Sequence, residues 1–464
     1  MTASATRPAP RSALLGWVLF DWAAQPFFTL IITFVYAPFF ASAIAADPVQ
    51  GQAMWGFATA AAGLVIAFCS PVLGAIADAG GRRKPWIATF GLLIVVGSAL
   101  LWYGRPGAPE TIPLVLAAYV IGTIGIEFAT VFNNAMMPSL VPPEQVGRLS
   151  GTGWATGYIG GLISLVIVLG FLAGNPQTGK TLIGVTPLFG LDPLLREGDR
   201  AAGPLTAVWF MIFILPLFLF TPDRPPGLPL VSAVRTGLAM VADTLRHLPK
   251  HRNTTLFLIA NLIYTDGMVA LFAFGGIYAA GTFGWGTIQI GVFGILLNIT
   301  ATFGAYLGGK LDDKLGPKPV IIGSLIILII AITAFLSIGR DYVFFVVPVE
   351  PPAPNAPMFA AAGERVYIAI GLIIGIAVGP AQAASRTLLV RLAPEEKVTQ
   401  YFGLFALSGK VTSFLGPFLV AVVTTAAASQ KAGMAVLIFF FAVGALVLSR
   451  VSVNQVSAGS AARR

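Results

Sequence analysis

The feature that most constrains this chain is a series of long apolar runs. A helix needs about 20 apolar residues to cross a bilayer, and twelve segments meet that length. Turn-forming pairs such as Gly80-Gly81 and Pro225-Pro226 separate them. The runs are too long and too uniform for transmembrane β-strands, which alternate over about 10 residues. The predicted spans are residues 14–41, 53–77, 86–104, 112–137, 146–173, 204–221, 254–281, 286–309, 318–338, 363–390, 398–427 and 431–449.

The composition excludes the common soluble classes. Charged residues make up 10% of the chain and hydrophobic residues 56%, whereas an average soluble domain has about 25% charged residues. A soluble enzyme, a disordered chain and a nucleic-acid-binding module are therefore excluded. The single cysteine, Cys69, and two histidines, His247 and His251, offer no metal site, cofactor site or nucleophile–base pair. We expect an all-α polytopic membrane protein that is not an enzyme and holds no metal or cofactor.

The basic residues predict the orientation. When the segments between spans are assigned alternately to two sides, 20 of the 28 Lys and Arg fall on the side of both termini. Seven fall on the other side, and Lys410 lies inside a span. This count places Arg386 in the loop after the tenth span. Cytoplasmic loops are enriched in Lys and Arg, so both termini are predicted to be cytoplasmic. The net charge of +9 then faces an anionic leaflet, and no nucleic-acid partner is needed to explain it.

A loop motif occurs twice, after the second and after the eighth span. Each copy has a glycine, an aspartate and a glycine spaced four and three residues apart. The two sets are Gly74, Asp78 and Gly81, and Gly309, Asp313 and Gly316. In the first copy Arg82 and Arg83 come next, and we expect Asp78 to pair with them and to act in gating. We call such a carboxylate–guanidinium contact between helices a latch. In the second copy Pro317 stands at the position of Arg82, so a symmetric latch is not expected.

Two groups of six spans with parallel repeats resemble the major facilitator superfamily, and the G-x-x-x-D-x-x-G-R-R-K loop is its most specific signature. The resemblance implies a twelve-helix fold in two bundles and a monomer. The expected division is residues 1–222 for the first bundle, 223–253 for a cytoplasmic linker, 254–450 for the second bundle and 451–464 for a cytoplasmic tail. Within the linker, residues 230–248 form an amphipathic pattern with basic neighbours, which is typical of a helix on a membrane surface.

Four ionisable residues fall inside predicted spans: Asp21, Glu127, Asp266 and Lys410. Each costs about 2.5–3.5 kcal/mol at the bilayer centre, so each must face water, a partner or a ligand. Three of them lie in spans one, four and seven, which line the central cavity in the facilitator plan. We interpret them as a site for a zwitterion or as a proton relay, with buried ion pairs as the structural alternative. Further candidates for the lining of the site are Gln25, Asn134, Tyr158, Tyr264, Gln382 and Arg386.

Several segments resemble the vacuolar amino-acid effluxer family, the autophagy-related branch of the facilitators, and its bacterial relatives. They are Phe20-Asp21-Trp22-Ala23, Gly153-Trp154-Ala155, Tyr264-Thr265-Asp266-Gly267, Gln382 to Arg386, and Lys410 to Pro417. The resemblance implies export of amino acids or similar small solutes by alternating access. The Ala- and Gly-rich composition favours a bacterial inner membrane. Proton or other cation coupling is left open.

Two alternatives remain at this stage. Arg83-Lys84-Pro85-Trp86 also resembles the loop of cation-coupled sugar symporters, with Trp22 as the candidate for stacking a sugar. The other alternative is a transporter-like fold that serves as a receptor or handles lipid without transport.

Overall fold

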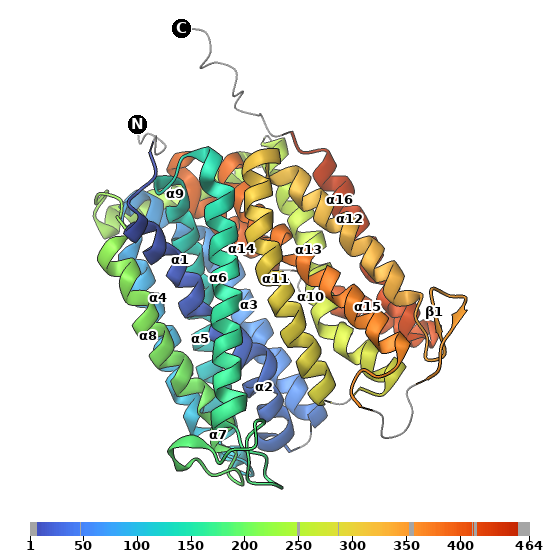
Figure 1. Ribbon diagram of the computed structural model, residues 1–464. Coiled ribbons are helices and arrows are strands. Elements are labelled where there is room, and N and C mark those ends of the chain that lie inside the picture. The colour runs from blue at the N-terminus through green and yellow to red at the C-terminus, as the bar shows by residue number, and fades with distance from the viewer. Residues whose placement is uncertain are drawn as a thin grey trace.

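The structure is a computed structural model, and it describes residues 7–46, 48–247, 251–285, 287–351, 357–410, 412 and 415–452. It is almost entirely helical, with one short β-hairpin (Figure 1). The elements of the first half are α1 (Arg11–Pro26), α2 (Tyr36–Phe39), α3 (Pro48–Gly80), α4 (Lys84–Leu100), α5 (Ile112–Met136), α6 (Val146–Ile167), α7 (Glu197–Arg200), α8 (Ala202–Phe220) and α9 (Leu230–His247). Those of the second half are α10 (Arg252–Phe283), α11 (Thr287–Leu315), α12 (Pro317–Leu336), β1 (Tyr342–Val343), β2 (Val347–Pro348), α13 (Ala362–Leu392), α14 (Val398–Lys410), α15 (Leu415–Ala427) and α16 (Gln430–Ser449).

Eleven of the helical segments in these ranges are long and apolar enough to cross a membrane. They confirm an all-α membrane protein and match eleven predicted spans. The exception is the eleventh prediction, 398–427, which is not one continuous helix among the described residues. It consists of α14 and α15, and residues 411, 413 and 414 between them lie outside the description. Pro417 lies in the first turn of α15, a position at which proline is tolerated.

Both loop motifs turn the chain at their second glycine. Gly81 and Gly316 each stand at the end of a long helix and adopt φ of +83° and +88°, a conformation that only glycine adopts without strain. A proline then stands in the first turn of the next helix, Pro85 in α4 and Pro317 in α12. Proline suits this position because its missing N–H would be unpaired there in any case. The internal repeat read from the sequence is therefore present in the backbone.

The start of α1, the end of α16 and α9 lie on one side of the molecule, which we call the terminal side (Figure 1). The two halves approach closely there. A Cβ on Gly151 of α6 would lie 2.7 Å from the Cα of Gly309 in α11. A Cβ on Gly74 of α3 would lie 2.8 Å from the Cα of Gln400 in α14. Glycine at these crossings lets the helix backbones approach at a distance that side chains would prevent.

Farther from the terminal side, α3 packs on one face only. Trp55, Ala58 and Ala62 are buried, while Phe57 is 76% and Phe68 75% exposed. From Ser70 to Ala77 the same helix is buried or half-buried on all sides, because α14 and α9 pack against it. The structure is thus closed between the halves at the terminal side.

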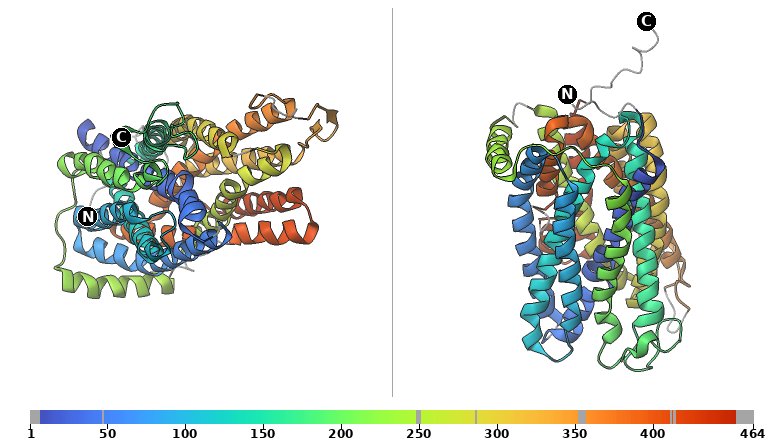
Figure 2. Two further views of the ribbon diagram at one scale, coloured as in Figure 1. Left: turned by 90° about the horizontal axis from the view of Figure 1, so that it is seen from below. Right: turned by 90° about the vertical axis from the view of Figure 1, so that its left-hand side faces the viewer.

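The predicted amphipathic helix forms as α9. It lies across the end of the spans at the edge of the molecule (Figure 2). Its small residues Ala233 and Gly237 are buried, and Gly237 faces the backbone of Ile76 in α3. A second apolar stripe points away from the protein, where Val231 is 84% and Leu238 51% exposed. The helix therefore has one face for the protein and another that needs a different partner.

Candidate functional site

A buried guanidinium, that of Arg386, connects the two halves. Arg386 lies in α13 and is 4% exposed. Its Nη1 donates to Asp21 Oδ2 of α1 and to Asn134 Oδ1 of α5, both at 3.1 Å. Its Nε donates to Ser150 Oγ of α6 at 3.0 Å, and Nη2 donates to the Ser150 carbonyl at 2.7 Å. Four of its five N–H groups thus bind three helices of the first half.

This geometry corrects the topology count. The count treats Arg386 as a loop charge, but it lies inside α13, six residues before the helix ends at Leu392. At 1.5 Å per residue that is about 9 Å from the helix end. The partner of Asp21 is also settled: the carboxylate forms its ion pair with Arg386, at 3.1 Å.

Aromatic rings surround the Arg386–Asp21 pair. The guanidinium carbon lies 5.6 Å from the centre of the Trp17 ring and 5.3 Å from that of Trp154. Trp17 is fully buried and donates to the Asn133 carbonyl at 2.7 Å, so it does not face lipid. Gly153 lies against the pair, and a Cβ there would collide with the Asp21 carboxylate. Such a low-polarity wall strengthens the electrostatic attraction within the pair.

Two hydroxyl contacts extend the site along α13. Tyr158 of α6 donates to Gln382 Oε1 at 2.5 Å and so joins the halves a second time. Tyr264 of α10 and Ser385 share a hydrogen bond of 2.7 Å within the second half. Gln25 of α1 packs against α6, since a Cβ on Gly161 would lie 2.8 Å from its Cγ. The structure therefore brings together most of the lining residues predicted from the sequence.

The remaining intramembrane charges are arranged differently. Asp266 of α10 is completely buried, and neither carboxylate oxygen has a hydrogen-bond partner among the described residues. Thr412, between α14 and α15, is the polar group beside it. The side chain of Lys410 lies outside the described part of the chain, so no partner is assigned to it. Glu127 is half-buried on α5, two helical turns before Asn134 and on the same face.

Trp22, the candidate for stacking a sugar, is already stacked within its own half. Its ring lies 5.6 Å from that of Trp209 at an angle of 16° and 5.6 Å from that of Phe213. Trp209 also donates to the Trp22 carbonyl at 3.0 Å. The indole is thus part of the packing between α1 and α8 rather than a free platform.

At the terminal side, Asp78 joins α3 to the start of α14. Its carboxylate accepts hydrogen bonds from the backbone N–H groups of Thr399 at 3.2 Å and Gln400 at 2.9 Å, and from the Thr399 hydroxyl at 2.5 Å. A carboxylate in this position caps the helix and complements its dipole. Thr399 and Gln400 were not found from the sequence; the only signal was their place just after Pro394-Glu395.

Arg83 completes this contact, and the expectation for Arg82 is wrong in this respect. Arg83 Nη2 lies 3.2 Å from Asp78 Oδ1, and both side chains are at most 1% exposed. Arg83 Nε also donates to Thr399 Oγ1 at 3.0 Å. Burial lowers the pKa of Arg83 to about 10, which leaves it charged at neutral pH. Arg82 is exposed and has no ion pair with Asp78, because the turn at Gly81 directs it to the other side of the loop.

The second copy of the motif makes the equivalent backbone contact. Asp313 Oδ1 of α11 accepts from the Arg148 N–H at 3.0 Å, in the first turn of α6. Gly309 lies at the close crossing of α11 with α6. The backbone contact is therefore common to both copies, since neither depends on the side chain at the position of Pro317, whereas the buried pair with an arginine occurs in the first copy.

Comparison with known proteins agrees with this architecture. The sequence profile of the family described as "Vacuole effluxer Atg22 like" matches residues 45–459. The Bacillus subtilis protein named "Uncharacterized MFS-type transporter YxiO" is 24% identical over 447 residues, 94% of each chain. Autophagy-related protein 22 of Cryptococcus neoformans is 25% identical over 321 residues, which cover 66% of this chain and 51% of the fungal protein.

Solved structures show the same fold. FucP, a major facilitator superfamily transporter in the outward conformation, matches with a TM-score of 0.67 at 16% identity, over 95% of this chain and 98% of its own. The human organic anion transporter MFSD10 matches with a TM-score of 0.65 at 14% identity, over 95% of this chain and 100% of its own. The chain therefore belongs to the Atg22-like vacuole effluxer family, and it is a transporter of small solutes with the major facilitator fold.

Proposed function

We propose that this protein exports amino acids by alternating access, with the Arg386–Asp21 pair at the centre of the substrate site. The family description as an effluxer supports the direction of transport. The proposal places both termini in the cytoplasm of a bacterial cell and the spans in its inner membrane. It keeps the division into bundles 1–222 and 254–450 that rock against each other.

The observation that carries the substrate class is a buried guanidinium fixed beside a carboxylate that is 13% exposed, between the two halves. A zwitterionic amino acid carries the complementary charges. Its α-carboxylate would take the place of Asp21 on Arg386, since guanidinium groups bind carboxylates through two parallel hydrogen bonds. Its ammonium group would then pair with the released Asp21. The Arg386–Asp21 pair would thus be replaced by two pairs, one between Arg386 and the substrate carboxylate and one between Asp21 and the substrate ammonium group. No charge would be left unpaired inside the membrane, where an unpaired charge is costly.

The terminal-side closure fits one state of the transport cycle. In this state Arg386 and Asp78 each join the halves, Arg386 about 9 Å inside the end of α13 and Asp78 at the terminal side itself. Substrate that competes for Arg386 removes one of these connections. A transporter needs such differential contacts, because a ligand shifts a conformational equilibrium only by its difference in affinity for the two states.

Asp266 is the candidate for proton coupling. It is completely buried in α10, its carboxylate has no hydrogen-bond partner in the described ranges, and Thr412 is the polar group beside it. Taking up a proton in one state and releasing it in the other would couple transport to a pH gradient. Glu127 and Lys410 remain further candidates for this role.

The test is counterflow in proteoliposomes that contain the purified full-length chain. Vesicles loaded with a mixture of amino acids are assayed for uptake of each labelled amino acid. We expect exchange in the wild type and a loss of at least roughly a hundredfold in Asp21→Asn and Arg386→Gln, because each removes one partner of the ion pair and breaking a buried pair costs about 3–5 kcal/mol. Arg235→Gln, an exposed arginine of α9, is the control of equal charge change and should exchange normally.

Asp266→Asn separates binding from coupling. We expect this variant to exchange amino acids across the membrane but to lose accumulation driven by a pH gradient. Exchange of sugars instead of amino acids by the same preparation would contradict the proposed substrate class. Normal exchange in Arg386→Gln would contradict the proposed site.

A further inference from the structure

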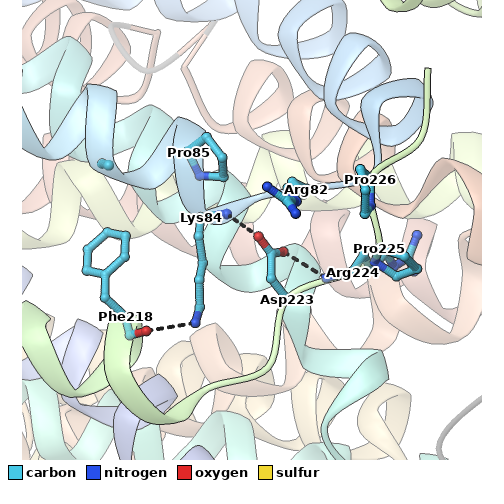
Figure 3. Close-up of a pocket in the computed structure, with 9 residues that line it drawn as sticks. Arg82, Lys84, Pro85, Phe218, Asp223, Arg224, Pro225 and Pro226 are labelled. Carbon is cyan, nitrogen blue, oxygen red and sulfur yellow. Dashed lines mark hydrogen bonds between the residues drawn. The ribbon is translucent and has the colours of Figure 1, made fainter. Parts of the chain in front are cut away.

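A cavity on the terminal side is lined by more basic than acidic side chains. Its volume is about 590 Å³, within the range of small-molecule sites. Its polar walls are Arg82, Lys84, Asp223 and Arg224, and Phe218 and Ala88 form the apolar part (Figure 3). Three cations against one carboxylate leave an excess of two positive charges. None of these groups belongs to the Arg386 site.

The single carboxylate in the cavity is already fully engaged. Asp223 accepts hydrogen bonds from the backbone N–H groups of Lys84 at 3.1 Å and Arg224 at 2.9 Å (Figure 3). It also accepts one from the backbone N–H of Arg83 at 2.9 Å. It therefore caps the start of α4 and holds the loop between α8 and α9 against it. Its charge is spread over these donors, and the cationic side chains around it are left with donors to spare.

Those spare donors can be counted. Lys84 Nζ donates to the Phe218 carbonyl at 2.9 Å and so uses one of its three N–H groups. Arg224 donates to the Glu395 carbonyl at 3.3 Å through one of five. The Arg82 side chain is exposed and makes no hydrogen bond or ion pair within the described part of the chain. A ligand with several anionic oxygens is what such a set of donors fits.

The depth of the cavity indicates what carries those oxygens. Lys84 is the first residue of one candidate span and Phe218 lies in the last turn of another, so the cavity lies where two spans end. This is the level at which hydrocarbon gives way to lipid headgroups. Exposed apolar side chains continue along α8 from here, with Leu219 71% and Leu215 53% exposed. Basic pockets at this level between helices are suited to anionic lipid headgroups.

We propose that this cavity binds the headgroup phosphate of an anionic phospholipid, whose acyl chains lie along α4 and α8. The bound lipid acts on the terminal-side closure through the backbone. Asp223 holds the N–H of Arg83, and the side chain of Arg83 holds Asp78. A headgroup that braces this loop stabilises the closed arrangement of the terminal side.

The test measures binding of fluorescent phosphatidylglycerol to the purified full-length protein in micelles of a neutral detergent. We expect Arg82→Gln to weaken binding about fivefold, the effect of one basic residue near an anionic lipid surface. Ala88→Trp, which fills the cavity without changing charge, should weaken it at least as much. Arg235→Gln on α9 removes an equally exposed cation outside the cavity and should leave the affinity unchanged.

Each outcome decides the proposal. Wild-type affinity in both cavity variants overturns it. An equal loss in Arg235→Gln shows diffuse attraction by the basic surface and overturns it as well. If inorganic phosphate displaces the fluorescent lipid at the same concentration as unlabelled phosphatidylglycerol does, the cavity is a site for free phosphate, which overturns the proposal. A thermal unfolding midpoint in neutral detergent that matches the wild type excludes misfolding of the variants.

Discussion

The two copies of the loop motif show which part of the repeat is structural. Asp78 accepts hydrogen bonds from the first turn of α14, and Asp313 accepts one from the first turn of α6. In each case an aspartate at the end of a helix in one half caps a helix of the other half. Gly81 and Gly316 turn the chain away directly afterwards. The feature common to both is a carboxylate on a helix N-terminus, an interaction with backbone groups.

The copies differ in the basic residue that comes after the turn. Arg83 lies beneath Asp78 with both side chains at most 1% exposed. Its counterpart Lys318 instead donates to the carbonyls of Ser449 and Val451, both at 2.7 Å, at the end of α16. The cation nearest Asp313 is the side chain of Arg148, which is 54% exposed and 3.9 Å away. One copy therefore contains a buried ion pair and the other a solvated one.

The largest difference should come from Asp78→Asn. An amide cannot neutralise Arg83, and removing one partner of a buried pair costs about 3–5 kcal/mol. We expect hydrogen exchange at the amides that begin α14 to accelerate at least roughly a hundredfold, because 1.4 kcal/mol is a factor of ten. Mass-spectrometric exchange of the peptide over residues 395–403 measures this directly.

Glu110→Gln, at an exposed site in the loop before α5, is the matched control. It removes one carboxylate without touching a latch and should leave exchange in that peptide unchanged. Exchange within about twofold of the wild type in Asp78→Asn would show that the buried pair does not hold the closure.

The second prediction separates the cap from the ion pair. In Asp78→Asn/Arg83→Gln both charges are gone, and no uncompensated cation remains in the interior. Replacing both partners of a buried pair is often much less damaging than removing one. We expect the double variant to exchange about tenfold more slowly than Asp78→Asn at the start of α14. If the double variant exchanges faster, Arg83 stabilises the closure independently of Asp78, through Thr399.

Most of the fold could be predicted from the sequence, because the length of an apolar run and a repeated motif are local signals. Eleven spans and both glycine turns can be derived from runs and spacings that can be counted. The division into α14 and α15 was not predicted, because the apolar run continues through both helices. A run of suitable composition does not distinguish one helix from two.

The site was only partly within reach. Asp21, Asn134 and Arg386 are all candidates from the sequence, but the charge count assigns Arg386 to a loop. Its pairing with Asp21 joins residues 365 positions apart, and no spacing rule reaches that far. The same limit explains why the motif predicts Arg82 beside Asp78: adjacent arginines are equivalent in a motif, and only the turn at Gly81 shows which of them turns inward.

The third prediction concerns the solvated copy. Asp313→Asn removes the charge that complements the α6 N-terminus but leaves an amide oxygen able to accept from the Arg148 N–H. A charge at a helix N-terminus contributes about 0.3–1 kcal/mol. We expect exchange at the start of α6 to accelerate no more than about fivefold, measured in the peptide over residues 144–152. An effect as large as that of Asp78→Asn would mean that the two copies are energetically equivalent, and that burial of the pair does not set the difference.

The smallest effect should come from Arg148→Ala. This substitution separates the backbone contact of Arg148 with Asp313 from its side-chain contact. Its backbone N–H lies 3.0 Å from Asp313 Oδ1 and survives the substitution, whereas the side-chain pair at 3.9 Å is lost. Exposed ion pairs contribute about 0–1 kcal/mol, and a pair this long and this solvated lies in the lower half of that range, so exchange at the start of α6 should change by less than about threefold. Arg148→Pro would remove the N–H, but it would also disturb the helix, so Asp313→Asn is the better partner for comparison. If Arg148→Ala equals Asp313→Asn, the side chains and not the backbone carry the second latch. If it is silent while Asp313→Asn is not, the carboxylate cap is the element that both copies share, and the buried Arg83 is what makes the first one stronger.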